Sequence, residues 1–217
     1  MIPDFELAAE SAMRTLLLHK ICAAPVDPLP ILKKTPGVLV MHFAELAANA
    51  GIERSNLVPM FGKNQDAVTF HIGADHLKYV VSYNQYLPFD MIRRGLAREL
   101  GHIVLGHDGT RPIDVRMAEA MCFARHLLFP RTLIHAIQQS GIPFTVEVVG
   151  SITGCYERCL AGLKETPGVK VPAELNRAVK NQFADCIRNF IDFQTVISSG
   201  DDSPAADFGS FMDMYKE

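Results

Sequence analysis

The segment Arg98-Glu99-Leu100-Gly101-His102 constrains the fold and chemistry of this chain more than any other feature. It matches the HExxH pattern at every position but the first. In that pattern two histidines four residues apart bind zinc from one helix face, and the glutamate serves as general base. One residue advances a helix by about 100°, so Arg98 and His102 point to nearly the same side. Arginine stays protonated and cannot ligate a metal. The segment therefore predicts a zinc-site helix that lacks its first ligand.

Composition places the chain among ordinary globular proteins. Its 217 residues are 48% hydrophobic and 21% charged, and a net charge of −3 gives no sign of direct nucleic-acid binding. No apolar run approaches the roughly 18 residues of a membrane-spanning helix, and the N-terminus lacks the basic start of a secretory signal. Five cysteines, an odd number without framework spacing, favour a reduced, cytoplasmic protein. Cys155 and Cys159 lie one helical turn apart, and we interpret them as small buried residues because no second Cys/His pair is near.

Apolar periodicity and turn residues predict an α+β fold. Two short runs rich in β-branched and aromatic residues, 67–72 and 77–83, flank a turn at 73–75 and predict a hairpin. Residues 37–43 predict one further strand, followed by a short alanine-rich helix that ends near Gly51. Helical spacing predicts the remaining helices at 5–22, from Pro88 to about Gly106, and at 115–128, 131–139, 145–163 and 173–197.

These elements suggest three parts of the chain. We expect residues 1–130 to form a core with its N-terminal helix, residues 131–197 a helical extension packed on it, and residues 198–217 a polar tail. Within the tail, Phe208, Phe211 and Met212 are the side chains available for docking. The proline-rich stretch 24–30 is expected to be a connector, because proline cannot continue the first helix.

The next predicted helix carries a second motif. Glu119 is its one acidic residue among apolar neighbours, and a buried carboxylate needs a partner. The hairpin, the segment 97–102 (Ala-Arg-Glu-Leu-Gly-His) and the segment 119–130 (Glu-Ala-Met-Cys-Phe-Ala-Arg-His-Leu-Leu-Phe-Pro) resemble the ImmA/IrrE family of metallopeptidases. That family shows Ala-His-Glu-Leu-Gly-His followed by a Glu-Ala-x-x-Phe-Ala-x-x-Leu-Leu-x-Pro helix. The resemblance covers roughly residues 35–130.

The resemblance implies a fold and a site. The fold would be zincin-like, with a small, mostly antiparallel sheet packed on the motif helices and additional C-terminal helices. Zinc would activate a water for peptide hydrolysis, and the family's associated substrates are helix-turn-helix repressors of mobile elements or stress regulons. On this chain His102 matches the second zinc ligand, Glu99 the catalytic general base and Glu119 the third ligand, whereas Arg98 takes the place of the first histidine.

Three interpretations of Arg98 remain open. In the first, the site holds no zinc, and Arg98 occupies the metal's place and pairs with Glu119 and also with Glu99. The chain would then be catalytically silent or impaired and would bind a repressor-like protein partner, with an extended peptide along the hairpin edge. In the second, His102, Glu119 and the substitute ligand His107 hold zinc weakly, and the chain is an active zinc peptidase that cleaves such a repressor. In the third, the motif is a packing remnant.

Overall fold

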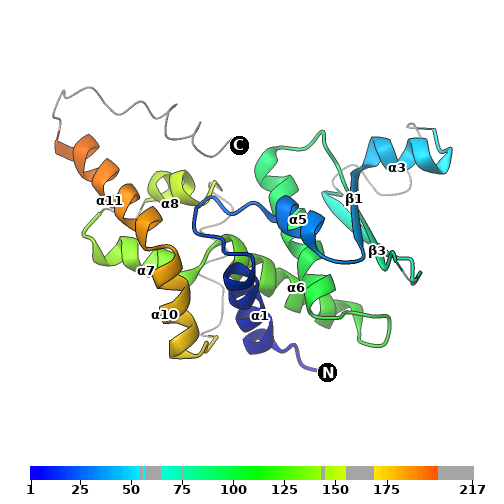
Figure 1. Cartoon of the computed structure of the whole chain (residues 1–217), viewed down its shortest axis with the longest axis horizontal. Helices are drawn as coiled ribbons and strands as arrows, with labels where there is room; N and C mark the ends of the chain where they lie inside the picture. The colour runs from blue at the N-terminus through cyan, green and yellow to red at the C-terminus, as the bar shows by residue number, and fades with distance from the viewer. Residues whose placement is uncertain (54–55, 57–64, 75, 143–144, 155–168, 200–217) are drawn as a thin grey trace.

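A small sheet lies at one end of the molecule and a group of helices at the other, with the helices of the two motifs between them (Figure 1). The structure, a computed structural model, describes residues 1–53, 56, 65–74, 76–142, 145–154 and 169–199. Cys155, Cys159, the end of the helix predicted at 145–163 and residues 200–217 of the predicted tail lie outside the described residues. The predicted α+β class is confirmed.

The three strands of the sheet lie in the order β1-β3-β2. Strands β2 (Ala67–His71) and β3 (Tyr79–Tyr83) form the predicted antiparallel hairpin, in which Ala67 faces Tyr83. Strand β1 (Val38–His42) pairs with β3 in parallel, so the sheet is mixed. A parallel pair needs a crossover connection, and the chain leaves β1 through helix α3 (Phe43–Ala50). This helix ends at Gly51 as predicted, and Gly51 takes the left-handed conformation.

The two motif helices cross at a glycine. Helix α5 (Phe89–Val104) and helix α6 (Ile113–Leu128) follow the predicted spans closely. A Cβ atom on Gly101 would lie 3.0 Å from Cδ1 of Phe123 and 3.1 Å from the carbonyl oxygen of Ala120. A larger residue would have to push these neighbours back by a few tenths of an ångström, so Gly101 favours the close approach of α5 to α6.

The first two helices precede the sheet. Helix α1 (Phe5–Leu18) packs on α6 and begins where the Asp4 side chain accepts a hydrogen bond from the amide of Leu7, 2.9 Å away. The prediction of a connector over 24–30 is wrong in its second half, because helix α2 (Pro28–Lys34) starts there. Pro28 and Pro30 lie in its first turn, where amides have no intrahelical partner, and Asp27 caps the helix.

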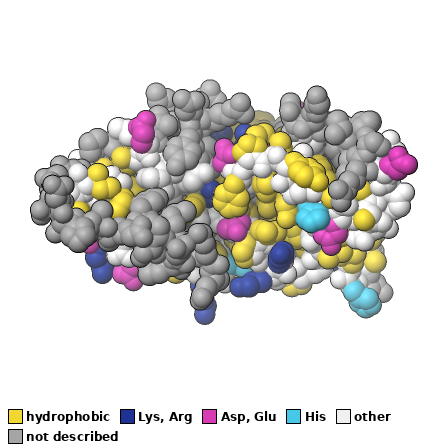
Figure 2. Space-filling view, turned by 90° about the horizontal axis from the view of Figure 1, so that it is seen from above, with side chains coloured by type: hydrophobic (Ala, Val, Ile, Leu, Met, Phe, Trp, Pro, Cys, Tyr) yellow, Lys and Arg dark blue, Asp and Glu magenta, His cyan; other side chains and the backbone are white. Residues whose placement is uncertain are grey.

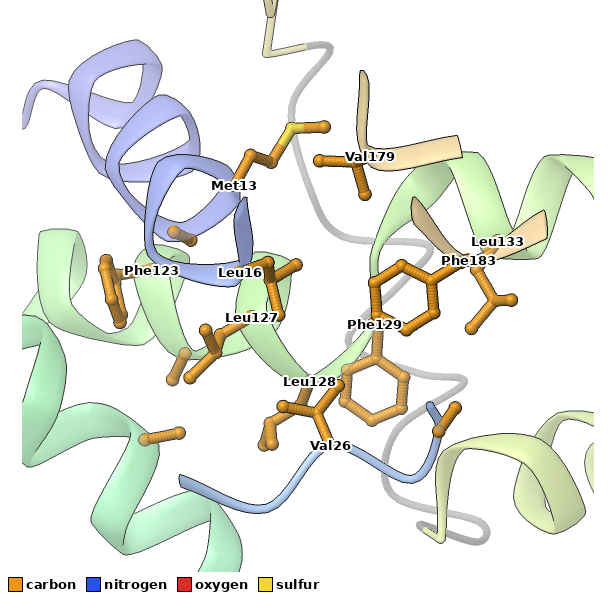
Figure 3. Packing of buried hydrophobic residues seen from close by; sticks show 14 of the residues in the cluster. Met13, Leu16, Val26, Phe123, Leu127, Leu128, Phe129, Leu133, Val179 and Phe183 are labelled. Atoms are coloured by element: carbon orange, nitrogen blue, oxygen red, sulfur yellow. The ribbon is translucent and has the colours of Figure 1, made fainter. Parts of the chain in front are cut away.

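The core is continuous from the N-terminal helix to the C-terminal ones. Figure 3 shows Met13 and Leu16 of α1 close to side chains of α6 and of the later helices. These later helices are α7 (Arg131–Gln139), α8 (Val146–Thr153), α10 (Ala173–Gln182) and α11 (Ala184–Ser199). Phe183, fully buried, lies between α10 and α11 and contributes to the same cluster. This continuity supports the proposal that residues 131–197 are an extension packed on the core.

The surface carries apolar side chains in limited areas. On the face seen from above, hydrophobic side chains gather over the middle of the molecule, with acidic and basic side chains beside them (Figure 2). Exposed examples in the chain include Tyr86 and Phe89, just before or at the start of α5. None of the helices in the described ranges has the length and apolar character required to cross a membrane.

Candidate functional site

A pocket of about 510 Å³ lies between strand β2, helix α5 and the start of helix α6. Thr69, Glu99 and His102 line it from the strand and from α5. His107 and Met117 line it from the opposite side. The fold therefore gathers the candidate residues around one cavity, although Glu119 does not line it and lies behind His107.

Arg98 makes four hydrogen bonds, and none goes to Glu119. Its Nη1 donates to Oδ1 of Asp66 at 2.8 Å, and its Nη2 donates to the carbonyl oxygen of Ala67 at 2.8 Å. Its Nε and Nη2 donate to Oε1 of Glu99 at 2.9 and 2.6 Å. The predicted Arg98–Glu119 pair is wrong, and the predicted contact with Glu99 is confirmed. Burial alone would lower the pKa of Arg98, but the charges of Glu99 and Asp66 outweigh it and raise that pKa.

Both oxygens of Glu99 are engaged. Arg98 occupies Oε1, and the hydroxyl of Thr69 donates to Oε2 at 2.7 Å. The Glu99 side chain is only 7% exposed. A general base needs a free oxygen within hydrogen-bond reach of the water it deprotonates. In this arrangement Oε1 of Glu99 is held by Arg98, and a role as that base would have to use the remaining lone pair of Oε2, which already accepts from Thr69.

Asp66 provides the second carboxylate for Arg98. It lies just before β2, with its side chain 6% exposed, and it also approaches Arg94 at 3.5 Å. Gly95 makes room for it, because a Cβ on Gly95 would lie 2.8 Å from the Asp66 carboxyl carbon. The chain thus places two acidic side chains around one guanidinium, which satisfies buried charges without a metal.

The two histidines of the site form a chain that ends on Glu119. His102 Nδ1 lies 2.9 Å from His107 Nδ1, and His107 Nε2 lies 2.9 Å from Oε2 of Glu119. Because a carboxylate only accepts, His107 must donate from Nε2, and its Nδ1 then accepts from His102 Nδ1–H. This tautomer leaves Nε2 of His102 as an acceptor. Burial, followed by His107, Arg98 and Arg116, lowers the pKa of His102 to about 4.

Glu119 accepts four hydrogen bonds. Arg111 donates from Nη1 and Nη2 to Oε2 and Oε1 at 2.9 Å each, which is a bidentate pair. The amide of Asp4 donates to Oε1 at 2.7 Å, and His107 donates to Oε2. The carboxylate is 2% exposed. Arg111 therefore provides the cation that Arg98 was expected to provide.

This donor set does not fit a zinc ion. Zinc binds two ligand nitrogens at about 2.0–2.1 Å, which puts them roughly 3.3 Å or more apart in a tetrahedral site. The facing nitrogens of His102 and His107 are 2.9 Å apart and share one proton, and both oxygens of Glu119 are held by Arg111. Within the described part of the chain, no three His, Cys, Asp or Glu residues form a group suited to a metal.

Three residues of this site were missed by the sequence reasoning. Asp66 precedes the predicted hairpin without any local signal, and Thr69 reads as an ordinary strand residue. Arg111 falls in the stretch between the two motif helices, which carries turn residues. Arg111 lies before α6, which starts at Ile113, so helical spacing does not predict its contact with Glu119 eight residues later. These partners become visible only when the elements are packed together.

Comparison with known proteins supports the sequence resemblance. The sequence model of the peptidase M78 family, the IrrE N-terminal-like domain, matches residues 58–153, which include the hairpin and both motif helices. No curated protein and no solved structure matches the chain. The match supports an ImmA/IrrE-type metallopeptidase homologue over this range. The predicted resemblance to the ImmA/IrrE family is confirmed over residues 58–153, which match the IrrE N-terminal-like domain.

Proposed function

We propose that this chain is a non-cleaving ImmA/IrrE-type protein that binds an extended segment of a protein partner along the edge of strand β2. The observation that carries the proposal is a β2 edge that no described residue pairs with, beside a pocket in which Arg98 and Glu99 are hydrogen-bonded to internal partners. The partner class follows from the family resemblance, which implies a repressor-like protein. The first interpretation of the sequence is retained, with Arg111 in the role expected of Arg98.

The outer edge of β2 has main-chain groups to offer. The amide of Asn84 donates to the carbonyl oxygen of Asp66, and the amide of Ile72 donates to the carbonyl oxygen of Lys78. Alternation in an antiparallel ladder then directs the amides and carbonyls of Thr69 and His71 away from β3. Among the described residues these outward groups have no hydrogen-bond partner. A peptide in extended conformation could add there as a strand, which is a common mode of peptide recognition.

The pocket beside this edge suits side chains of a bound peptide. Ile113 and Met117, which are 70% and 40% exposed, lie across it and provide an apolar wall. Nε2 of His102 is the acceptor end of the histidine chain and suits a donor on the peptide. Apolar contact combined with a few placed polar groups is the ordinary composition of a binding pocket.

Cleavage lacks support in the same geometry. Glu99 is tied to Arg98 and Thr69, and Glu119 is tied to Arg111. The second interpretation, an active zinc peptidase with His107 as substitute ligand, requires His102 and His107 to separate and Arg111 to leave. We therefore derive no hydrolytic step for this chain.

A peptide selection tests the proposal. Random linear peptides displayed on phage are selected on the immobilised full-length chain, and the selected peptides are then synthesised. Their dissociation constants are measured by fluorescence anisotropy for the wild type and for His71→Pro, which removes one outward amide of β2. Proline on an edge strand is tolerated when the lost amide faces outward. We expect His71→Pro to weaken binding at least about tenfold, or roughly 1.4 kcal/mol.

The matched control is His71→Ala, which keeps the amide and should change the affinity less than about twofold. Mass spectrometry of the incubated peptides should show them intact. Equal binding by wild type and His71→Pro would refute the strand-edge mode. Cleavage of a selected peptide, abolished by Glu99→Gln, would instead favour the active peptidase.

A further inference from the structure

A second cavity lies on the other side of α5 from the site pocket. It has a volume of about 690 Å³ and is bounded by the end of α1, the end of α2 and the last turns of α5. Its floor is apolar and includes Leu17, Leu18, Leu100 and Val104. Leu18 is 78% exposed and Val104 is 41% exposed, which is unusual for adjacent large apolar side chains.

The charged side chains around this groove are basic. Arg14, His19 and Lys34 line it, and no acidic residue of the described ranges does. Arg14 is paired with Glu10 on its own helix, whereas Lys34 makes no ion pair with any described residue. On α1 the lining residues Ser11, Arg14, Thr15 and Leu18 follow helical spacing, so one helix face forms the groove wall. An apolar floor with a basic rim suits an amphipathic acidic segment.

The last residues of the chain have that character. Residues 200–217 contain five acidic residues and one lysine. Four of their five large apolar residues, Phe208, Phe211, Met212 and Tyr215, stand at positions i, i+3, i+4 and i+7, and Met214 lies outside this pattern. This is the spacing by which an amphipathic helix inserts one apolar face into a groove. The pattern belongs to the sequence alone, because the segment lies outside the described residues.

The connection is long enough for this segment to reach the groove. Gln182, at the end of α10, donates to the carbonyls of Leu16 and Ile21, so α11 starts near the C-terminal end of α1, which bounds the groove. Helix α11 (Ala184–Ser199) then carries the chain about 22–24 Å away. The eight residues 200–207 span up to about 26–29 Å when extended. They are sufficient to return Phe208 to the groove.

We propose that residues 208–215 dock as a helix in this groove of their own chain. Phe211 and Met212 would lie on Leu18 and Val104, and Asp213, the one acidic residue within 208–215, would face Lys34. The tether makes modest affinity sufficient, because a linked segment has an effective concentration in the millimolar range. Leu100 and Val104 line the groove while Glu99 and His102 line the site pocket, so docking would brace the helix that carries the site.

Tryptophan fluorescence tests the docking in the full-length chain. The protein contains no tryptophan, so Phe211→Trp supplies a single reporter. We expect blue-shifted emission and an acrylamide quenching constant at least about threefold below that of the urea-unfolded chain. Adding Leu18→Glu should raise the quenching constant by about the same factor, and Lys34→Glu should raise it in the same direction. Circular dichroism checks that each variant is folded.

Ile113→Glu is the matched control, because Ile113 is exposed to 70% but lines the site pocket instead of the groove. It should leave the emission unchanged. The proposal is overturned if the reporter tryptophan is quenched as in urea, or if Leu18→Glu has no effect. It is also overturned if Ile113→Glu alone exposes the tryptophan, which would place the segment in the site pocket. Burial that disappears on dilution would assign the groove to a second copy and equally reject docking within one chain.

Discussion

The cluster around Arg98 makes a quantitative prediction about stability. Replacing Arg98 with methionine keeps an unbranched apolar stem but removes the guanidinium, with its charge and four hydrogen bonds. The side chains of Asp66 and Glu99 are 6% and 7% exposed and would lose their main cation. Removing one partner of a buried ion pair costs about 3–5 kcal/mol. Arg94 stays near Asp66 at 3.5 Å, so we expect the lower half of that range.

The assay is urea unfolding followed by far-ultraviolet circular dichroism near pH 7. Arg98→Met should lower the midpoint at an unchanged denaturant slope, which attributes the loss to the folded state. Adding Glu99→Gln should recover roughly 1.5–2 kcal/mol, because a neutral amide needs no cation. The control is Arg188→Met, since Arg188 pairs with Asp185 at the surface, with side chains 67% and 85% exposed. That variant should stay within about 0.5 kcal/mol of the wild type.

Two results would refute the reasoning. If Arg98→Met unfolds at the wild-type urea concentration, Asp66 and Glu99 do not depend on the guanidinium, and the ionic cluster is not what replaces the metal. If the double variant with Glu99→Gln is no more stable than Arg98→Met, the cost arises from lost packing and not from an uncompensated carboxylate.

Three further perturbations follow from the same site. Gly101→Ala should lower the free energy of unfolding by about 1–3 kcal/mol, because its Cβ would lie 3.0 Å from an aromatic carbon of α6. Gly109→Ala is the control, because a Cβ there would meet no atom within 4 Å, and it should change the free energy of unfolding by less than about 0.5 kcal/mol. Equal free energies of unfolding for the two variants, measured by chemical denaturation, would contradict the close crossing of α5 and α6. The unfolded chain protonates His102 near pH 6.5, whereas the folded chain, in which the pKa of His102 is lowered, resists protonation down to about pH 4. The free energy of unfolding should therefore fall as the pH is lowered through that window, and His102→Gln should flatten the decrease. Elemental analysis should find well under one zinc per chain, and chelator should leave Tm unchanged. Arg98→His should gain little zinc by itself, whereas Arg98→His with Arg111→Met should bind it at least about tenfold more tightly in a competition titration.

The elements of the site could be predicted from the sequence because each is encoded locally. Helix α5 carries a periodic apolar face and ends near Gly106, and α6 runs to the residue before Phe129 and Pro130. The hairpin follows from β-branched runs on either side of Gly73. The start of α2 does not follow from the proline-rich pattern alone, because proline both ends a preceding helix and can open the next one. Pro28 at the first helical position needs no amide partner and favours a helix start.

The partners within the site could not be predicted in the same way. Arg98 selects Asp66 from 32 residues earlier in the chain, and nothing in the spacing distinguishes that carboxylate from Glu119. The partner of Arg98 depends on Gly95, which lets Asp66 approach α5, and on Arg111, which pairs with Glu119 instead. Sequence patterns report faces and ends of helices, whereas ion-pair partners depend on distances set by tertiary packing.

The position of Arg111 changes what the missing zinc ligand means. A divalent zinc ion would compensate the charge of the carboxylate that binds it, and two guanidiniums compensate the carboxylates here. Arg98 does so for Glu99 and Asp66, and Arg111 does so for Glu119. A histidine at position 98 would restore one ligand but leave Glu119 in its bidentate pair with Arg111. Both Arg98 and Arg111 would therefore have to be replaced before the donor atoms could turn toward a metal. We therefore infer that the departure from the HExxH pattern is not an isolated substitution in an otherwise intact zinc site. It accompanies two separate ion-pair clusters, one around Arg98 and one between Arg111 and Glu119, which compensate the buried carboxylates without metal.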